Sequence, residues 1–294
     1  MTINFKVDEE KCIHCGLCIK DCMPKVLTFN ENKIPQVIDE REKNCMKCQH
    51  CLCICPAGAI SILDKSPENS FECQNNFNAD EILQLIEQRR SVRYYKKQNV
   101  DEETVKKLKN MLHYVPTGVN NHNLRFTFVE NIEVMDKIRE KVGKTIISLV
   151  ENQKWAKKQF GRYLKPILNG EDIIFRGAPH MIVVSTPKNA PCKGIDPIIS
   201  LSYFELYAKS LGLGTCWCGL AYYCFKFIPQ LKYILNIPKT HELGYVMLFG
   251  YPEFEYKRTP QPLEYNIETI DEMPKEKVSL LSKIFGSSKD EERK

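Results

Sequence analysis

Eight cysteines near the N-terminus occur at a spacing that suits metal ligation. Three cysteines two residues apart, followed by a fourth after three more residues, occur in both CIHCGLCIKDC and CMKCQHCLCIC. The cysteines at these positions are Cys12, Cys15, Cys18, Cys22, Cys45, Cys48, Cys51 and Cys55. Two-residue gaps let a loop curl until three thiolates converge on one face of a cubane cluster. The repeated spacing therefore predicts two [4Fe-4S] clusters.

The fourth cysteine of each copy stands apart from the other three, and its position predicts which cluster it serves. Displaced along the chain and followed by a proline turn, it points away from its own loop and ligates the other cluster. The expected ligand sets are Cys12, Cys15, Cys18 and Cys55 for one cluster, and Cys45, Cys48, Cys51 and Cys22 for the second. Zinc is the competing interpretation, although structural zinc usually takes two separated C-x2-C pairs. Cys53 fits no ligand position, and we expect it to be a small buried residue.

This N-terminal segment resembles the bacterial two-[4Fe-4S] ferredoxin over residues 3–63. Each cysteine motif precedes a similar short stretch, KVLTFN or GAISIL, which predicts an internal repeat with a pseudo-two-fold axis. One departure from the family pattern is Met23, which separates Cys22 from Pro24. We expect it to make the first turn slightly looser than the second.

Composition limits what the chain can be. Its 294 residues are 43% hydrophobic, enough for two domains and at least one sizeable core. No run of about 18 apolar residues and no signal-peptide pattern occurs, so we expect neither a membrane span nor secretion. Fourteen cysteines in such a chain indicate metal ligands or buried thiols in a reducing cytoplasm. The net charge of +5 is modest and no basic stripe stands out, so nucleic-acid binding has no support.

Four segments further along the chain could bind an anion or a planar ring. They are RRSVR from Arg89, PTGVNN from Pro116, GTCWCG from Gly214 and YKR from Tyr256. Arginine forks beside a serine suit a phosphate, but alone the first segment could be a solvated basic helix end. The second could be ordinary turn chemistry, and the third is no G-x-G-x-x-G fingerprint because position 217 is Trp.

Taken in order, these segments resemble the FMN-dependent nitroreductase family over residues 80–265. The resemblance implies contacts to the phosphate and ribityl tail of FMN from the basic segments, with Lys257 as a helper. It implies that the Pro-Thr-Gly loop reaches the flavin of the other subunit, so that the protein is a homodimer with FMN at the interface. It also implies that the third segment lies along the isoalloxazine ring with backbone N–H groups near N5. The residues carried over are Arg89, Arg90, Ser91, Arg93, Pro116, Thr117, Asn120, Trp217, Cys218, Gly219, Lys257 and Arg258.

Two departures from the family pattern affect this site. His122, Asn123 and Leu124 stand where the family often has Gln, Pro and Trp. Cys218 places a thiol in the flavin loop, and we interpret it as packing because no neighbouring cation is evident in the sequence to lower its pKa. Cys216 and Cys224 are expected to be core residues, and Cys73 a bystander.

The elements that must position these residues follow from hydrophobic periodicity and turn signals. Helices are predicted from 80 to 91, opened by acidic residues, and from 101 to 115, capped by Asp101. Strands are predicted at 126–130, 180–186 and 243–252, and a buried helix from 200 that Gly212 ends. Without regular βαβ alternation this favours an α+β fold with a central mixed sheet flanked by helices.

The predicted organisation has four parts. A ferredoxin-like domain covers 1–63, a linker 64–79, the nitroreductase-like domain 80–265 and a charged tail 266–294. Residues 145–177 align with nothing in the family pattern and predict a helix and a loop. Trp155, Phe160 and Tyr163 in that segment are either lid residues or plain helix packing.

These parts together predict an FMN-dependent oxidoreductase. Two [4Fe-4S] clusters would pass single electrons to FMN, which would reduce a small electron-poor, nitroaromatic-like substrate by hydride transfer. The external electron donor would be reduced ferredoxin or NAD(P)H, and no side chain is assigned as a covalent catalyst. The alternatives are an electron-transfer protein that relays charge to a protein partner, and a zinc-stabilised binding module without redox activity.

Overall fold

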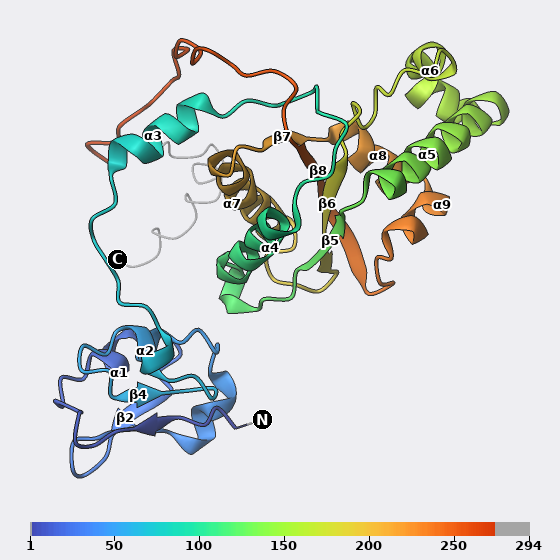
Figure 1. Ribbon diagram of the computed structural model, residues 1–294. Coiled ribbons are helices and arrows are strands. Elements are labelled where there is room, and N and C mark those ends of the chain that lie inside the picture. Colours follow the sequence, from blue (N-terminus) through green and yellow to red (C-terminus); the bar gives the residue numbers. More distant parts are fainter. Residues whose placement is uncertain (1, 274–294) are drawn as a thin grey trace, which may run out of the picture. The chain divides into compact units, whose positions relative to one another are not determined.

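The computed structural model describes residues 2–273 (Figure 1). Its N-terminal part holds two antiparallel two-stranded sheets and two short helices. The strands are β1 (Lys6–Val7) paired with β4 (Ile60–Ser61), and β2 (Leu27–Phe29) paired with β3 (Pro35–Val37). The helices are α1 (Leu17–Asp21) and α2 (His50–Cys53), with a 3₁₀ helix η1 (Asp39–Asn44) between them. A small cluster of buried apolar residues that includes Ile3, Val26 and Ile60 lies at its centre.

The two cysteine motifs have the same backbone conformation. Backbone φ is positive at three equivalent positions of the two copies. The first two lie within each motif, with φ of 56° at His14 and 55° at Lys47, then 71° at Gly16 and 60° at Gln49. The third lies three residues after the fourth cysteine, with φ of 53° at Lys25 and 57° at Gly58. Each short helix begins two residues after the second cysteine of its motif. This agreement supports the predicted internal repeat.

The turn after Cys22 is not looser than its counterpart, contrary to our expectation from Met23. Lys25 N–H donates to the carbonyl of Cys22 at 3.0 Å, and Gly58 N–H donates to that of Cys55 at 3.2 Å. Since Lys25 and Gly58 adopt the same left-handed conformation, the two turns close alike. Met23 is 77% exposed, so its side chain does not interfere with the turn.

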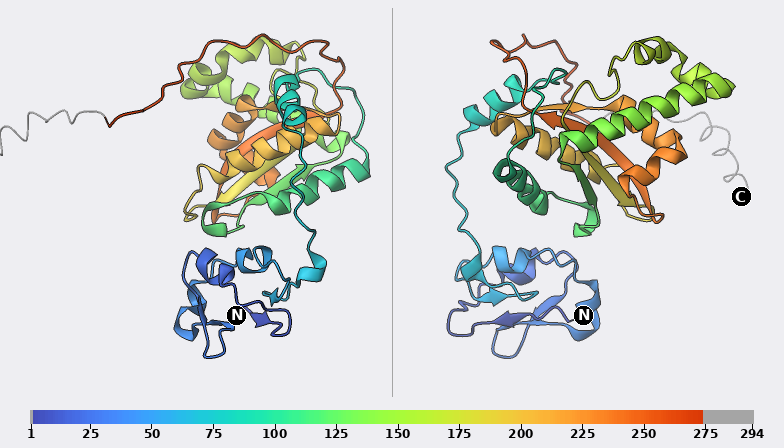
Figure 2. Two further views of the ribbon diagram at one scale, coloured as in Figure 1. Left: turned by 90° about the vertical axis from the view of Figure 1, so that its left-hand side faces the viewer. Right: turned by 45° about the vertical axis from the view of Figure 1, so that its right-hand side comes forward.

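The C-terminal part is built on a four-stranded sheet in the order β5–β6–β8–β7 (Figures 1 and 2). All pairings between these strands are antiparallel, and one parallel bridge between Ser91 and Thr215 extends the β7 edge. The strands are β5 (Arg125–Val129), β6 (His180–Pro187), β7 (Gly214–Trp217) and β8 (His241–Gly250). The predicted α+β class is confirmed.

Helices cover both faces of this sheet. Successive residues of β6 alternate between the two faces, so Met181 and Val183 pack in one apolar cluster while Ile182 and Val184 pack in the other. The helices of this part are α3 (Ala79–Gln88), α4 (Glu102–Met111), α5 (Ile132–Asn152), α6 (Lys154–Leu168), α7 (Asp196–Ser210), α8 (Gly219–Phe227) and α9 (Pro229–Lys232). The first cluster includes residues of α5, α6, α8 and α9, and the second includes residues of α4 and α7.

Most predicted elements of this part occur near the expected positions. The Asp101 side chain accepts a hydrogen bond from Thr104 N–H at 2.8 Å, as an N-cap of α4 should. Acidic residues open α3 as expected, since Asp80 and Glu81 lie in its first turn, and Asn78 is its N-cap, with a side-chain oxygen that accepts from Asp80 N–H at 3.0 Å. Residues 145–177 contain the end of α5 and all of α6, and Phe160 is buried, so this side chain packs in the core.

The predicted linker holds one 3₁₀ helix, η2 (Pro67–Asn69), and exposed aromatic side chains at Phe71 and Phe77. The predicted domain boundaries stay predictions. Of the predicted tail 266–294, the part from residue 274 lies outside the described residues. Among residues 2–273, no helix combines the length and the apolar character needed to cross a membrane.

Candidate functional site

The eight motif cysteines surround two small enclosed spaces in the N-terminal part. One space is lined by Cys12, Cys15, Cys18 and Cys55, and the other by Cys22, Cys45, Cys48 and Cys51. The fourth cysteine of each motif thus faces the three thiols of the other motif, which is the partition that the spacing predicts. Cys53 lines neither space, and it is exposed rather than buried as we expected, because the inward positions of α2 are taken by Cys51 and Leu52.

Backbone N–H groups point at several of these sulfur atoms. Val26 N–H donates to Cys22 Sγ at 3.4 Å, and Ala59 N–H donates to Cys55 Sγ at 3.2 Å. A third donor, Lys47 N–H, lies 3.4 Å from Cys45 Sγ. Such hydrogen bonds favour thiolate over thiol, and around a cluster they tune its reduction potential.

Two of the buried motif thiols ionise less readily than an ordinary cysteine. Burial raises the pKa of Cys51 to about 12 and raises the pKa of Cys18 above its usual value. Each of the two spaces is surrounded by four thiols, which is the donor set that a [4Fe-4S] cluster requires. No three His, Cys, Asp or Glu side chains among the described residues are grouped tightly enough to hold a single metal ion.

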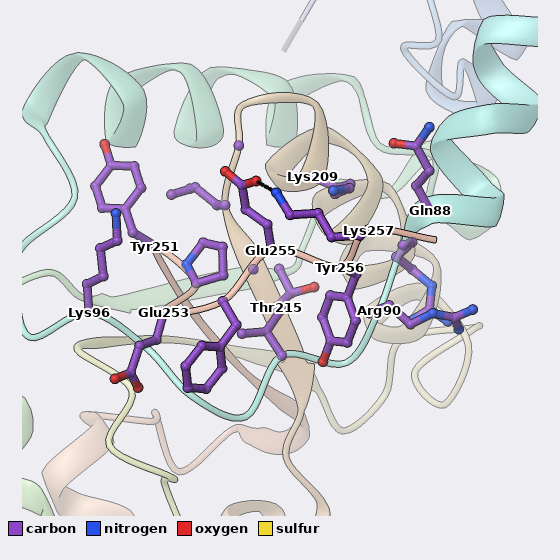
Figure 3. A pocket seen from close by; sticks show the side chains of 17 residues that line it. Gln88, Arg90, Lys96, Lys209, Thr215, Tyr251, Glu253, Glu255, Tyr256 and Lys257 are labelled. Carbon is purple, nitrogen blue, oxygen red and sulfur yellow. Dashed lines mark hydrogen bonds and ion pairs between the residues drawn. The ribbon is translucent and has the colours of Figure 1, made fainter. Parts of the chain in front are cut away.

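A cavity of about 640 Å³ lies beside the β7 edge of the large sheet (Figure 3). The segment after α3, the end of α7, the start of β7 and the segment after β8 line it. Arg89, Arg90 and Lys257 all line this cavity, although the chain separates them widely. The antiparallel pairing of β7 with β8 and the Ser91–Thr215 bridge bring these segments together.

Arg90 is the cavity residue whose chemistry calls most plainly for an anion. Its Nη2 atom is buried and has no hydrogen-bond partner among the described residues. A buried cationic donor without an acceptor is costly, and a phosphate would supply that acceptor in a two-pronged geometry. The residues present therefore fit the phosphate of FMN.

The neighbouring predicted residues differ in how they are engaged. Arg89 Nη1 donates to Glu205 Oε1 at 3.3 Å. Lys257 Nζ lies 2.7 Å from Glu255 Oε2, but both side chains are more than three-quarters exposed, so this pair contributes little to stability. Arg93 is exposed and its Nη1 donates to the carbonyl of Ser91, while Arg258 is exposed and does not line the cavity.

The predicted flavin loop alternates between the two faces of the sheet. Trp217 packs with the α7 side, where its Nε1–H donates to Glu205 Oε2 at 3.0 Å. Cys218 packs on the opposite side, and its Sγ–H donates to the carbonyl of Ile174 at 3.1 Å. Burial raises the pKa of Cys218 to about 12, which supports the packing interpretation of this thiol. Gly219 is the first residue of α8.

The Pro-Thr-Gly loop does not line the cavity. Pro116 is exposed, and Thr117 and Asn120 are half-buried around the 3₁₀ turn η4 (Gly118–Asn120). The loop is tied to the start of α7, because Gly118 N–H donates to Asp196 Oδ1 at 3.0 Å and Asn121 Nδ2 lies 3.4 Å from Asp196 Oδ2.

Glu205 and Thr215 also contact the predicted site residues, and no sequence motif indicated them. Both are buried, and Thr215 Oγ1 donates to Glu205 Oε1 at 3.3 Å. The signal that could have found Glu205 is a lone carboxylate in the apolar run YFELYA of a buried helix, since such a charge must be paired.

Replacing Gly118 by alanine is expected to destabilise the protein. A Cβ at Gly118 would overlap with Cys192 Sγ and lie 2.8 Å from Cys192 Cβ, contacts that force the loop or the thiol to move. Overpacking of this kind typically costs about 1–3 kcal/mol of unfolding free energy. Chemical denaturation of the variant measures it. Gly194→Ala is the matched control, since a Cβ there meets no atom within 4 Å, and an equal stability for both variants would contradict the expectation.

The fold and the two sites define a two-part redox protein, and its sequence relationships agree. Residues 86–251 match the nitroreductase family and residues 11–59 match the 4Fe-4S dicluster domain. The chain belongs to the nitroreductase family and carries a ferredoxin domain at its N-terminus. It is therefore a nitroreductase-family oxidoreductase, as the sequence motifs predict.

Individual relatives cover one part or the other. The chain is 24% identical over 194 residues to an iodotyrosine deiodinase of Thermotoga neapolitana, covering 63% of this chain and 97% of the relative. It is 35% identical over 77 residues to an uncharacterised ferredoxin of Methanocaldococcus jannaschii, covering 26% of this chain and 97% of that ferredoxin. Its fold is similar to that of a Bacteroides fragilis nitroreductase crystallised with bound FMN, with a TM-score of 0.54, 20% identity, and coverage of 65% of this chain and 99% of that one.

Proposed function

We propose that this protein is an FMN-dependent oxidoreductase that uses electrons from two [4Fe-4S] clusters to reduce a small electron-poor substrate of the nitroaromatic kind. Reduced ferredoxin or NAD(P)H would be the external donor. The observation that carries the FMN assignment is the buried Nη2 of Arg90, which has no partner among residues 2–273 and shares one cavity with Arg89 and Lys257. The bound FMN in the Bacteroides fragilis nitroreductase supports it.

Residues of this chain would hold FMN at one site and the two clusters at the other. When bound, FMN supplies the exchange between single electrons and a hydride. Arg90, assisted by Arg89, would hold the phosphate, and the backbone N–H of Gly219 would face the ring at the start of α8. The two cysteine sets would fix the clusters, with backbone N–H groups donating to sulfur.

We further propose that the protein is a homodimer in the cytoplasm. A homodimer would place Pro116, Thr117 and Asn120 of one protomer at the flavin of the other. A reducing cytoplasm would keep the 14 cysteines available as ligands and free thiols.

Anaerobic turnover tests this proposal. The protein is purified and reconstituted without oxygen, reduced by ferredoxin or dithionite, and mixed with a nitroaromatic or an iodotyrosine. We expect flavin absorbance to bleach on reduction and to return when a small acceptor is added, with product formed in proportion. Flavin that is reduced but reoxidised by no small acceptor would overturn the enzyme assignment and favour a relay to a protein partner. A colourless, iron-free preparation would overturn the redox assignment altogether.

A further inference from the structure

A buried carboxylate joins two of the segments proposed to hold FMN. Glu205 belongs to α7, on a helix side whose other members, Leu201, Phe204 and Ala208, are fully buried and apolar. The residue is 7% exposed. A charge in such surroundings is retained only where donors satisfy it.

Three donors converge on this carboxylate, and they come from two separate segments. Oε1 accepts from Arg89 Nη1 at 3.3 Å, and Oε2 accepts from the indole Nε1–H of Trp217 at 3.0 Å. The hydroxyl of Thr215 donates to Oε1 at 3.3 Å. The contact to the indole is the shortest of the three.

The geometry of these contacts requires a carboxylate. Arg89 and Trp217 can only donate, and each takes a different oxygen of Glu205. A glutamine amide has one oxygen, so an amide that keeps the indole hydrogen bond must turn its NH₂ group toward the guanidinium. The carboxylate is therefore anchored at Oε1 by Arg89 and Thr215 and presents Oε2 to Trp217.

We propose that Glu205 is a positioning residue that fixes the indole of Trp217 for contact with the flavin ring. The inference rests on the proposed function, since it takes Trp217 as a ring contact. Trp217 also packs against Tyr245, with ring centroids 5.3 Å apart. The hydrogen bond to Glu205 restricts rotation of the indole about the Cβ–Cγ bond of Trp217.

Glu205→Gln tests the role with riboflavin as the probe. Riboflavin has the ring but no phosphate, so its binding is free of any repulsion between the phosphate and Glu205. We expect its dissociation constant, measured by flavin fluorescence, to rise roughly tenfold, since one buried donor loses its acceptor. In a Trp155→Phe background Trp217 is the single tryptophan, and its emission in the flavin-free protein should shift with Glu205→Gln.

Glu242→Gln is the matched control, because Glu242 also pairs with a cation, Lys193 Nζ at 3.4 Å, but lies outside the cavity. It should leave riboflavin binding and Trp217 emission unchanged. If Glu205→Gln does not fold, Glu205→Asp provides the test, because its shorter carboxylate keeps the charge but cannot reach both partners. We expect riboflavin binding several-fold weaker than in the wild type for this variant too.

The outcomes separate this inference from the function on which it rests. Wild-type protein that binds neither FMN nor riboflavin overturns both. The assignment of Glu205 alone is overturned if the wild-type protein binds both ligands and the Glu205 variant leaves two measurements unchanged. These are the riboflavin dissociation constant, within twofold of the wild-type value, and the Trp217 emission.

Discussion

Replacing Cys55 by serine is expected to remove the cluster of the first cysteine motif, although Cys55 lies in the second. Cys55 lines the same space as Cys12, Cys15 and Cys18, so its loss leaves that space with three thiols. A serine hydroxyl is a poor substitute for a soft thiolate on iron. The anaerobically reconstituted variant should hold roughly half of the wild-type iron, measured by iron analysis and by absorbance near 400 nm.

Double variants identify which cluster is lost. Cys15→Ser combined with Cys55→Ser removes two ligands of one space, so it should hold as much iron as Cys55→Ser alone. Cys48→Ser combined with Cys55→Ser affects both spaces, so it should hold almost none. The reverse pattern would contradict the crossed ligation. Cys53→Ser is the control, because Cys53 lines neither space and should retain the full iron content.

The cysteine sets could be predicted from the sequence because their geometry is local. Spacing decides which thiols a loop can bring together, and left-handed residues occur at equivalent positions of the two copies. The two errors in this region concern single side chains. We expected Met23 to loosen the turn after Cys22, but Lys25 closes that turn as Gly58 closes its counterpart. We expected Cys53 to be buried, but Cys51 and Leu52 occupy the buried side of α2.

The cavity that we propose for FMN was less predictable because it depends on long-range pairing. The basic residues near 89 and 257 could be assigned to one phosphate site only through their order along the chain. What brings them together is the register of β7 with β8 and the bridge from Ser91 to Thr215, and neither leaves a periodic signal. The contacts of Glu205 could not be predicted for the same reason, since its three donors lie 10, 12 and 116 residues away.

Replacing Arg90 by alanine is expected to abolish most FMN binding while leaving riboflavin binding nearly unchanged. Its buried Nη2 has no partner among the described residues, and the FMN phosphate would supply the acceptor in the proposed site. Charge-assisted hydrogen bonds contribute about 1.5–3 kcal/mol each, which corresponds to roughly 10- to 150-fold in the dissociation constant. Arg90→Lys should fall between the two, because an ammonium keeps the charge but loses the planar fork.

The stability of the FMN-free protein gives a second measure of the same residue. Removing a buried donor that lacks an acceptor should leave the unfolding free energy unchanged or raise it by about 1 kcal/mol. Arg125→Ala, an exposed arginine on β5, is the control and should change neither FMN binding nor stability by more than about 0.5 kcal/mol. If Arg90→Ala weakens riboflavin and FMN equally, Arg90 supports the fold of the site rather than the phosphate, and the cavity beside β7 is not the phosphate end of a flavin site.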